Sequence, residues 1–137
     1  MRRALLAVAG ALLLLGAACS SDEGGDPGPP LEGTTWVLTS YDGPDVPDGV
    51  SVDLLLEDGK ASGRSGCNSY GGSYETSGDQ LTFGPLAATQ MACPQEQMDV
   101  EAAYLAALER TAGSAVDGDE LVLSDAQGAE LLRFRQG

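Results

Sequence analysis

The side chains that could do chemistry in this chain are its cysteines and carboxylates, because histidine is missing. The sequence holds Cys19, Cys67 and Cys93 but no histidine, which excludes Ser–His–Asp and Cys–His nucleophilic centres in their usual form. Two cysteines without an imidazole do not complete a zinc site. Cys67 and Cys93 are also too far apart for the Cys-x-x-Cys motif of thiol exchange. We therefore expect no enzymatic activity, no metal and no cofactor.

The carboxylates are numerous, but they stand where solvated charges normally belong. The chain has 21 acidic and 7 basic residues, and nearly all the acids fall in expected turns or on polar strand faces. Asp42, Asp45 and Asp48 are evenly spaced, but prolines interrupt them and no EF-hand loop is present. Carboxylate catalysis and a calcium site are thus minor alternatives. Ser65 stands in an incomplete Gly-x-Ser-x-Gly frame without a base, and we interpret it as a turn serine.

The start of the chain predicts export from the cytoplasm. Arg2 and Arg3 precede an apolar run, residues 4–18, which is shorter than the ~20 residues of a membrane span. Small residues then lead directly to Cys19, a pattern that resembles a bacterial lipobox, in which the cysteine is acylated and becomes the new N-terminus. We expect residues 1–18 to be a signal peptide and Cys19 to anchor the protein to a membrane of the cell envelope. Ordinary signal cleavage and an uncleaved anchor are the alternatives.

Charge narrows the range of partners. Loss of Arg2 and Arg3 with the signal peptide would change the net charge from −14 to −16. Such an excess of negative charge repels phosphate backbones and anionic lipid headgroups. We therefore expect no nucleic-acid partner, and membrane contact only through the lipid anchor.

Export also determines the interpretation of the remaining cysteines. With Cys19 taken by lipid, Cys67 and Cys93 form an even pair in a compartment where disulfides persist. Closing this loop would stabilise the fold by about 3–4 kcal/mol on the chain-entropy model. We expect these two cysteines to form a structural disulfide.

The pattern of apolar residues predicts strands, one helix, and then strands again. Residues 19–30 are expected to be a lipidated N-terminus and flexible linker, because residues 20–30 contain no large apolar side chain. A helix is expected from Pro94 and should end by Gly113. Met98, Ala102 and Leu105 lie along one stripe of it, and Val100, Tyr104 and Leu108 lie beside that stripe. The expected strands are 34–41, 50–57, bent strands within 60–74, 80–83 ending at Gly84-Pro85, 120–124 and 130–136, with a hairpin turn at Asp58-Gly59. This order indicates the α+β class, an antiparallel sheet packed against a single helix.

The residues around the two cysteines carry a family signature. The segments Gly66-Cys67-Asn68-Ser69-Tyr70-Gly71-Gly72-Ser73-Tyr74 and Thr89-Gln90-Met91-Ala92-Cys93 resemble the META domain of HslJ-type envelope lipoproteins. Residues 31–38, 101–108 and 118–123 resemble further parts of that domain, so residues 31–137 are assigned to it. The resemblance implies a small, partly open β-barrel with one helix and links to heat shock and novobiocin resistance. No catalytic residue is established for the family.

Within the signature we expect a structural motif rather than a ligand site. Gly66 allows the chain to bend, Asn68 caps the bend, and Tyr70 and Tyr74 supply packing, with Met91 in the second segment. The expected function is a lipid-anchored envelope protein with a non-enzymatic binding or stress-tolerance role. The alternative is a carrier of a small apolar ligand or lipid in a half-open barrel. Its lining would be Trp36, Leu54, Leu56, Phe83 and Leu132.

Overall fold

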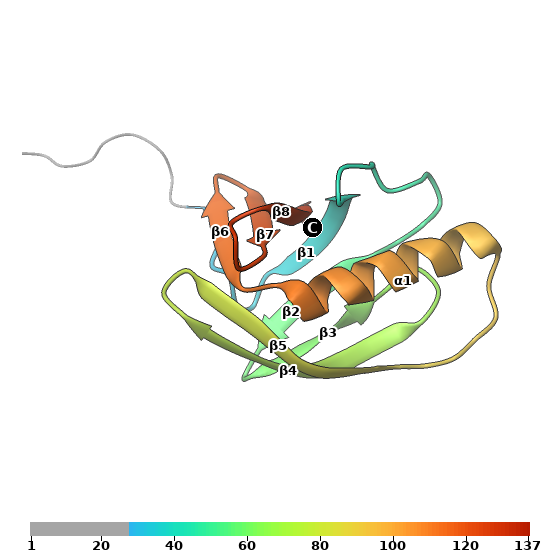
Figure 1. Ribbon diagram of the computed structural model, residues 1–137, viewed down its shortest axis with the longest axis horizontal. Helices are drawn as coiled ribbons and strands as arrows, with labels where there is room; N and C mark the ends of the chain where they lie inside the picture. Colours follow the sequence, from blue (N-terminus) through green and yellow to red (C-terminus); the bar gives the residue numbers. More distant parts are fainter. Residues whose placement is uncertain (1–27) are drawn as a thin grey trace, which may run out of the picture.

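The computed structural model describes residues 28–137, shown in colour in Figure 1. The expected signal peptide, the acylated Cys19 and most of the expected linker lie outside these described residues. In chain order the elements are β1 (Thr35–Tyr41), β2 (Asp53–Glu57), β3 (Lys60–Arg64), β4 (Ser69–Ser77), β5 (Gln80–Ala88), α1 (Gln95–Arg110), β6 (Gly113–Asp117), β7 (Glu120–Ser124) and β8 (Glu130–Gln136). Among residues 28–137, no helix has the length and apolar character needed to cross a membrane.

The strands form one antiparallel sheet that bends round into a ring. Each strand pairs with the next along the chain, and β1 pairs with β8 to close the circle. The junction between β5 and β6 is the slightest, with Gln80 and Gly113 as its one Cα pair. The helix α1 lies along this side of the sheet and packs against β5, β1 and β8 (Figure 1). The expected fold class, an antiparallel barrel-like sheet packed against one helix, is confirmed.

Alternating side chains fill the inside of the ring. In β2, Leu54 and Leu56 are fully buried, whereas Asp53 and Leu55, which alternate with them, are half-buried. The interior is completed from other strands and from the helix by Trp36, Leu81, Tyr104, Leu108, Leu121, Leu123, Leu132 and Phe134, which are all fully buried. Burial of so many large apolar groups supplies the main driving force for folding.

The β2–β3 hairpin follows the turn chemistry that its sequence predicts. Asp58 and Gly59 have φ angles of 51° and 77°. A two-residue hairpin turn of this kind needs positive φ at both positions, and Asp-Gly adopts this at little cost.

One strand continues past the point where the sequence predicted its end. The prediction that the fifth strand stops at Gly84-Pro85 was wrong, because β5 runs on to Ala88. Between the pairs Tyr74–Phe83 and Gly72–Leu86 the register shifts, so that two residues of β5 face only Ser73 of β4. This is a β-bulge, one of the few places in a sheet where proline is tolerated.

The strand β6 was not predicted at all. Its sequence, Gly-Ser-Ala-Val-Asp, contains one large apolar residue, Val116, and that side chain is exposed. Because β6 is held by its backbone pairing with β7 rather than by buried side chains, the alternation used to find strands is absent. The expected helix limit at Gly113 agrees with the structure, since α1 ends at Arg110.

The helix buries the expected stripe of Val100, Tyr104 and Leu108, and not the stripe that begins at Met98. Its fully buried residues are Val100, Tyr104, Ala107 and Leu108. Met98 and Ala102 are exposed, so both sides of α1 carry apolar residues and only one side faces the core.

Candidate functional site

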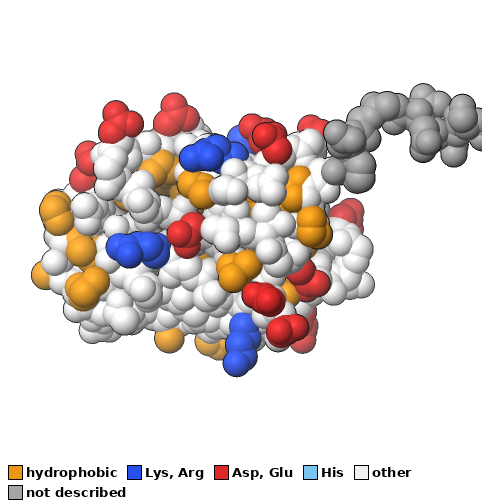
Figure 2. Space-filling view, turned by 180° about the vertical axis from the view of Figure 1, so that it is seen from behind, with side chains coloured by type: hydrophobic (Ala, Val, Ile, Leu, Met, Phe, Trp, Pro, Cys, Tyr) orange, Lys and Arg blue, Asp and Glu red, His pale blue; other side chains and the backbone are white. Residues whose placement is uncertain are grey.

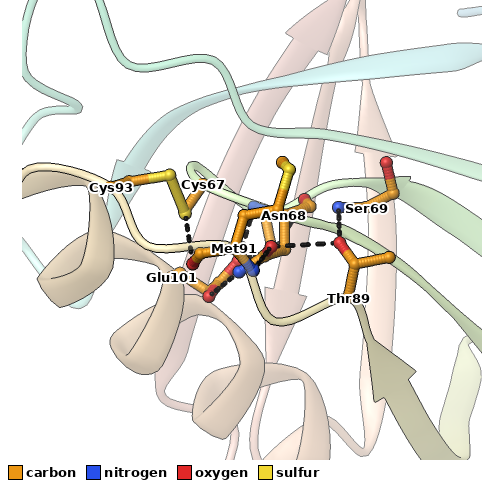
Figure 3. The surroundings of a disulfide bond; sticks show 8 residues. Cys67, Asn68, Ser69, Thr89, Met91, Cys93 and Glu101 are labelled. Carbon is orange, nitrogen blue, oxygen red and sulfur yellow. Dashed lines mark hydrogen bonds between the residues drawn. A yellow bond between two sulfur atoms is a disulfide. The ribbon is translucent and has the colours of Figure 1, made fainter.

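The disulfide expected from the sequence is present and joins two distant segments. Cys67 lies in the loop between β3 and β4, and Cys93 lies just before α1; their Cα atoms are 5.8 Å apart (Figure 3). Cys67 is buried and Cys93 half-buried. Cys67 Sγ also lies 3.3 Å from the Met91 carbonyl oxygen, a packing contact because a disulfide sulfur has no proton to donate.

Asn68, next to the disulfide, connects three segments through its side chain. Its Oδ1 accepts hydrogen bonds from the Met91 backbone N–H at 2.7 Å and from the Thr89 hydroxyl at 3.0 Å. Its Nδ2 donates to Glu101 Oε2 on α1 at 2.9 Å (Figure 3). The buried amide therefore uses both of its ends, as a buried polar group must. It ties the segment after β5 and the helix to its own loop.

Glu101 is the acceptor at the centre of these contacts. Its Oε1 accepts hydrogen bonds from the Asn68 backbone N–H at 2.8 Å and from the Ser65 hydroxyl. Desolvation raises the pKa of the Glu101 carboxyl, but the hydrogen bonds from Ser65 and Asn68 outweigh it and bring the pKa below its usual value. Within residues 28–137 no cation pairs with Glu101, so polar donors alone stabilise the charge.

The site contains a residue that was not predicted, Glu101, and Ser65 has a larger part in it than that of a turn serine. Ser65 is fully buried, which an ordinary turn serine would not be. Glu101 precedes Tyr104 by three positions and Leu108 by seven, so it stands in the register of the buried helix face. A charged residue in that register was the available signal.

Gly66 is required by two independent features of the loop. Its φ angle is 113°, in the region that favours glycine. A Cβ at this position would lie 3.0 Å from the Gln97 carbonyl oxygen of α1. The loop can thus approach the helix closely enough for Asn68 to reach Glu101.

The two signature tyrosines lie inside the ring but apart from this cluster. The Tyr70 hydroxyl donates to the Asp53 carbonyl oxygen at 2.8 Å and lies 2.6 Å from the Tyr104 hydroxyl. Burial raises the pKa of both phenols, so they stay neutral. Tyr74 donates to Glu32 and so attaches the segment before β1 to β4. Tyr70 and Tyr74 thus stabilise the fold through packing and hydrogen bonds.

An open groove lies beside the cluster, between the segment after β5 and α1. Its volume is about 480 Å³, and its lining includes Asn68, Met91, Met98 and Glu101. Met91 is 58% exposed and Met98 is 41% exposed. The groove therefore combines the polar groups of Asn68 and Glu101, which are already hydrogen-bonded, with two exposed thioether side chains.

The residues expected to line a carrier cavity instead fill the interior. Trp36, Leu54, Leu56 and Leu132 are fully buried members of the core, and Phe83 packs against it. The Trp36 indole N–H donates to the Leu31 carbonyl oxygen at 3.0 Å, which holds the segment before β1 against the ring. These side chains belong to one apolar core.

Comparison with known proteins agrees with this architecture. The family model described as the META domain matches residues 29–137. A protein from Burkholderia xenovorans, solved by NMR, is 35% identical over 83% of this chain and 92% of its own, with a TM-score of 0.62. A second NMR structure is 24% identical over 74% of this chain and 87% of its own, with a TM-score of 0.60. At this level of identity the two proteins are similar in fold. Among curated proteins, none matches.

Proposed function

Because this chain belongs to the META domain family, we propose that it is a non-enzymatic binding module, fastened to a membrane of the cell envelope by lipid on Cys19 and active in stress tolerance. The observation that carries the proposal is the Cys67–Cys93 disulfide, integrated with the Asn68 and Glu101 contacts. A fold that contains a structural disulfide suits an oxidising compartment.

Two further features support a place outside the cytoplasm. The charged, apolar and small residues that precede Cys19 follow the order of a lipoprotein signal. Acidic side chains are also spread over the face of the domain seen in Figure 2, which suits an exported protein that must stay soluble next to anionic lipid. The stress-tolerance role is supported by the family resemblance.

A binding role suits the site better than catalysis does. Glu101, the carboxylate most deeply engaged by the fold, already accepts hydrogen bonds from Ser65 and from both the backbone and side chain of Asn68. Its lowered pKa makes it a poor proton acceptor near neutral pH. The filled interior likewise favours a binding surface over the carrier alternative.

Metabolic labelling tests the anchor. Cells that produce the full chain are grown with a clickable palmitate analogue, and the protein is isolated and assayed for label. We expect label on the wild type and none on Cys19→Ser, with Ser21→Ala, a nearby substitution, labelled like the wild type. A wild-type protein without label, or a Cys19→Ser variant with full label, would contradict the proposal.

A further inference from the structure

Two backbone hydrogen bonds and a disulfide connect the segment from Thr89 to Cys93 to the rest of the fold. The Thr89 N–H donates to the Ser69 carbonyl oxygen at 3.0 Å, and the Met91 N–H donates to Asn68 Oδ1 at 2.7 Å. Cys93 then closes the segment with its disulfide to Cys67 (Figure 3). Little conformational freedom is left to lose when another molecule binds there, and preorganisation of this kind favours affinity.

This rigid segment presents an apolar side chain to solvent. Among residues 28–137 the exposed large hydrophobic side chains are Met91, Met98 and Val116, and the first two line the same groove. Methionine is flexible and polarisable, and it recurs at surfaces that bind peptide segments. The disulfide and the hydrogen bond to Asn68 therefore hold the backbone of Met91 in place, while the Met91 side chain lies outside the core.

The outer face of α1 extends the apolar surface. Met98 and Ala102 are exposed on this face, whereas Leu105, one turn further on, is half-buried and packs against the core. Met91, Met98 and Ala102 define what we call the Met91–Met98 surface. Partly exposed apolar groups gathered on one face mark an interaction site more often than scattered ones do.

Charge selects the class of partner. The helix carries exposed Glu96, Asp99 and Glu109, besides Glu101, against one basic residue, Arg110. Two copies of the chain meeting through α1 would bring these acidic groups together, and an anionic lipid surface would repel them. A segment with Lys or Arg beside an apolar side chain complements both the thioethers and the acidic residues of α1.

We propose that the Met91–Met98 surface is the docking site of this module for a protein segment in which an apolar anchor stands next to Lys or Arg. The inference rests on the proposed binding role but not on the lipid anchor. Its position suits an anchored protein, because the described chain begins at Gly28 against Gly118 of the β6–β7 turn. The helix begins at the opposite side of the molecule (Figure 1).

Site-specific photocrosslinking in cells tests the docking site. The full chain is produced with a photoreactive benzophenone amino acid in place of Ala102, and crosslinked peptides are identified by mass spectrometry. We expect one protein adduct, attached at a segment with an apolar residue adjacent to Lys or Arg. Met91→Glu or Met98→Glu should reduce its yield at least about tenfold, as for a central anchor of an interface. Val116→Glu, the matched change on β6, should leave the yield unchanged.

Every other result overturns the docking site. Crosslinks to a second copy of this chain, crosslinks to lipid, no crosslink, or an adduct that survives both methionine substitutions would each do so. Since Met91 is largely exposed, Met91→Glu should keep the disulfide and the wild-type melting temperature, so a lost adduct is not lost folding. An acylated Cys19 without the adduct refutes only the docking site, whereas the adduct without acylation refutes only the anchor.

Discussion

At the scale of single residues, Asn68 and Glu101 explain why the signature has its polar members. The pair connects the β3–β4 loop, the segment after β5 and α1 through hydrogen bonds between 2.7 and 2.9 Å. An anion that accepts several hydrogen bonds contributes more than a neutral acceptor does, and breaking one bond leaves buried donors unpaired. The pair is therefore a structural centre rather than a reactive one.

Replacing Glu101 with glutamine should lower the free energy of unfolding by about 1–3 kcal/mol at pH 7, because an amide cannot accept all of these donors. Fluorescence-monitored urea unfolding measures this loss. Glu109→Gln, on the exposed face of the same helix, should change stability by less than about 0.5 kcal/mol. Equal stability of Glu101→Gln and the wild type would show that the carboxylate is not needed.

The same variant should remove part of the pH dependence of stability. The pKa of Glu101 is lower in the folded protein than its usual value of 4.5, so the folded state favours the ionised form. The resulting stability is present above about pH 4.5 and is lost as the pH falls through the folded-state pKa. The gap between wild type and Glu101→Gln should narrow in that window. A gap that stays constant down to the acid limit of folding would contradict this assignment.

How much of the site can be predicted differs from one residue to the next. Cys67 and Cys93 are recognisable because the predicted lipidation of Cys19 would leave them as an even pair, and Asn68 because it stands in the signature. Glu101 can be placed on the buried face of the helix by its register, but its partners are set by how the β3–β4 loop crosses the helix. Gly66, with its positive φ, provides the predicted bend, but the sequence does not say which part of the helix the loop then meets.

At the scale of elements, the disulfide is the covalent link between the β3–β4 loop and the start of α1. Cys67→Ser and Cys93→Ser should each lower stability by about 3–4 kcal/mol on the chain-entropy model. Both single variants should melt at similar temperatures, and the double variant should be no less stable than either. Additive losses in calorimetry would mean that the two cysteines act separately.

The bulge that carries β5 past Pro85 makes a second prediction at this scale. A Cβ on Gly72 would lie 2.6 Å from the Pro85 carbonyl oxygen, whereas one on Gly71 would meet Ala61 O at an ordinary 3.5 Å. Gly72→Ala should therefore destabilise the protein by about 1–3 kcal/mol through overpacking. Gly71→Ala, its neighbour on the same strand, is the control and should be nearly neutral. Indistinguishable thermal midpoints for the two variants would refute the close packing of the bulge.

Elements with local signals are predictable from the sequence, and those held by their neighbours are not. The Asp58-Gly59 turn and the alternation of β2 reflect local chemistry, and both appear in the structure. The continuation of β5 and the presence of β6 depend on pairing with β4 and β7. Their own residues carry little apolar alternation, so the sequence pattern could not reveal them.

At the scale of the whole molecule, the ring of strands encloses the apolar core. Its interior is filled by buried side chains from the strands and α1. Of the large apolar side chains exposed within residues 28–137, Met91 and Met98 line one groove, and Val116 lies on β6. The segment before β1 is fastened to the ring through Glu32 and the Leu31 carbonyl oxygen.

Intact mass spectrometry of the protein extracted from cell membranes tests most directly whether the chain carries both the lipid anchor and the disulfide. We expect a polypeptide that begins at Cys19, with its mass increased by acyl chains and decreased by the two hydrogens lost in the Cys67–Cys93 bond. Recovery from the cytosol with Met1 in place and both later thiols free would contradict the account.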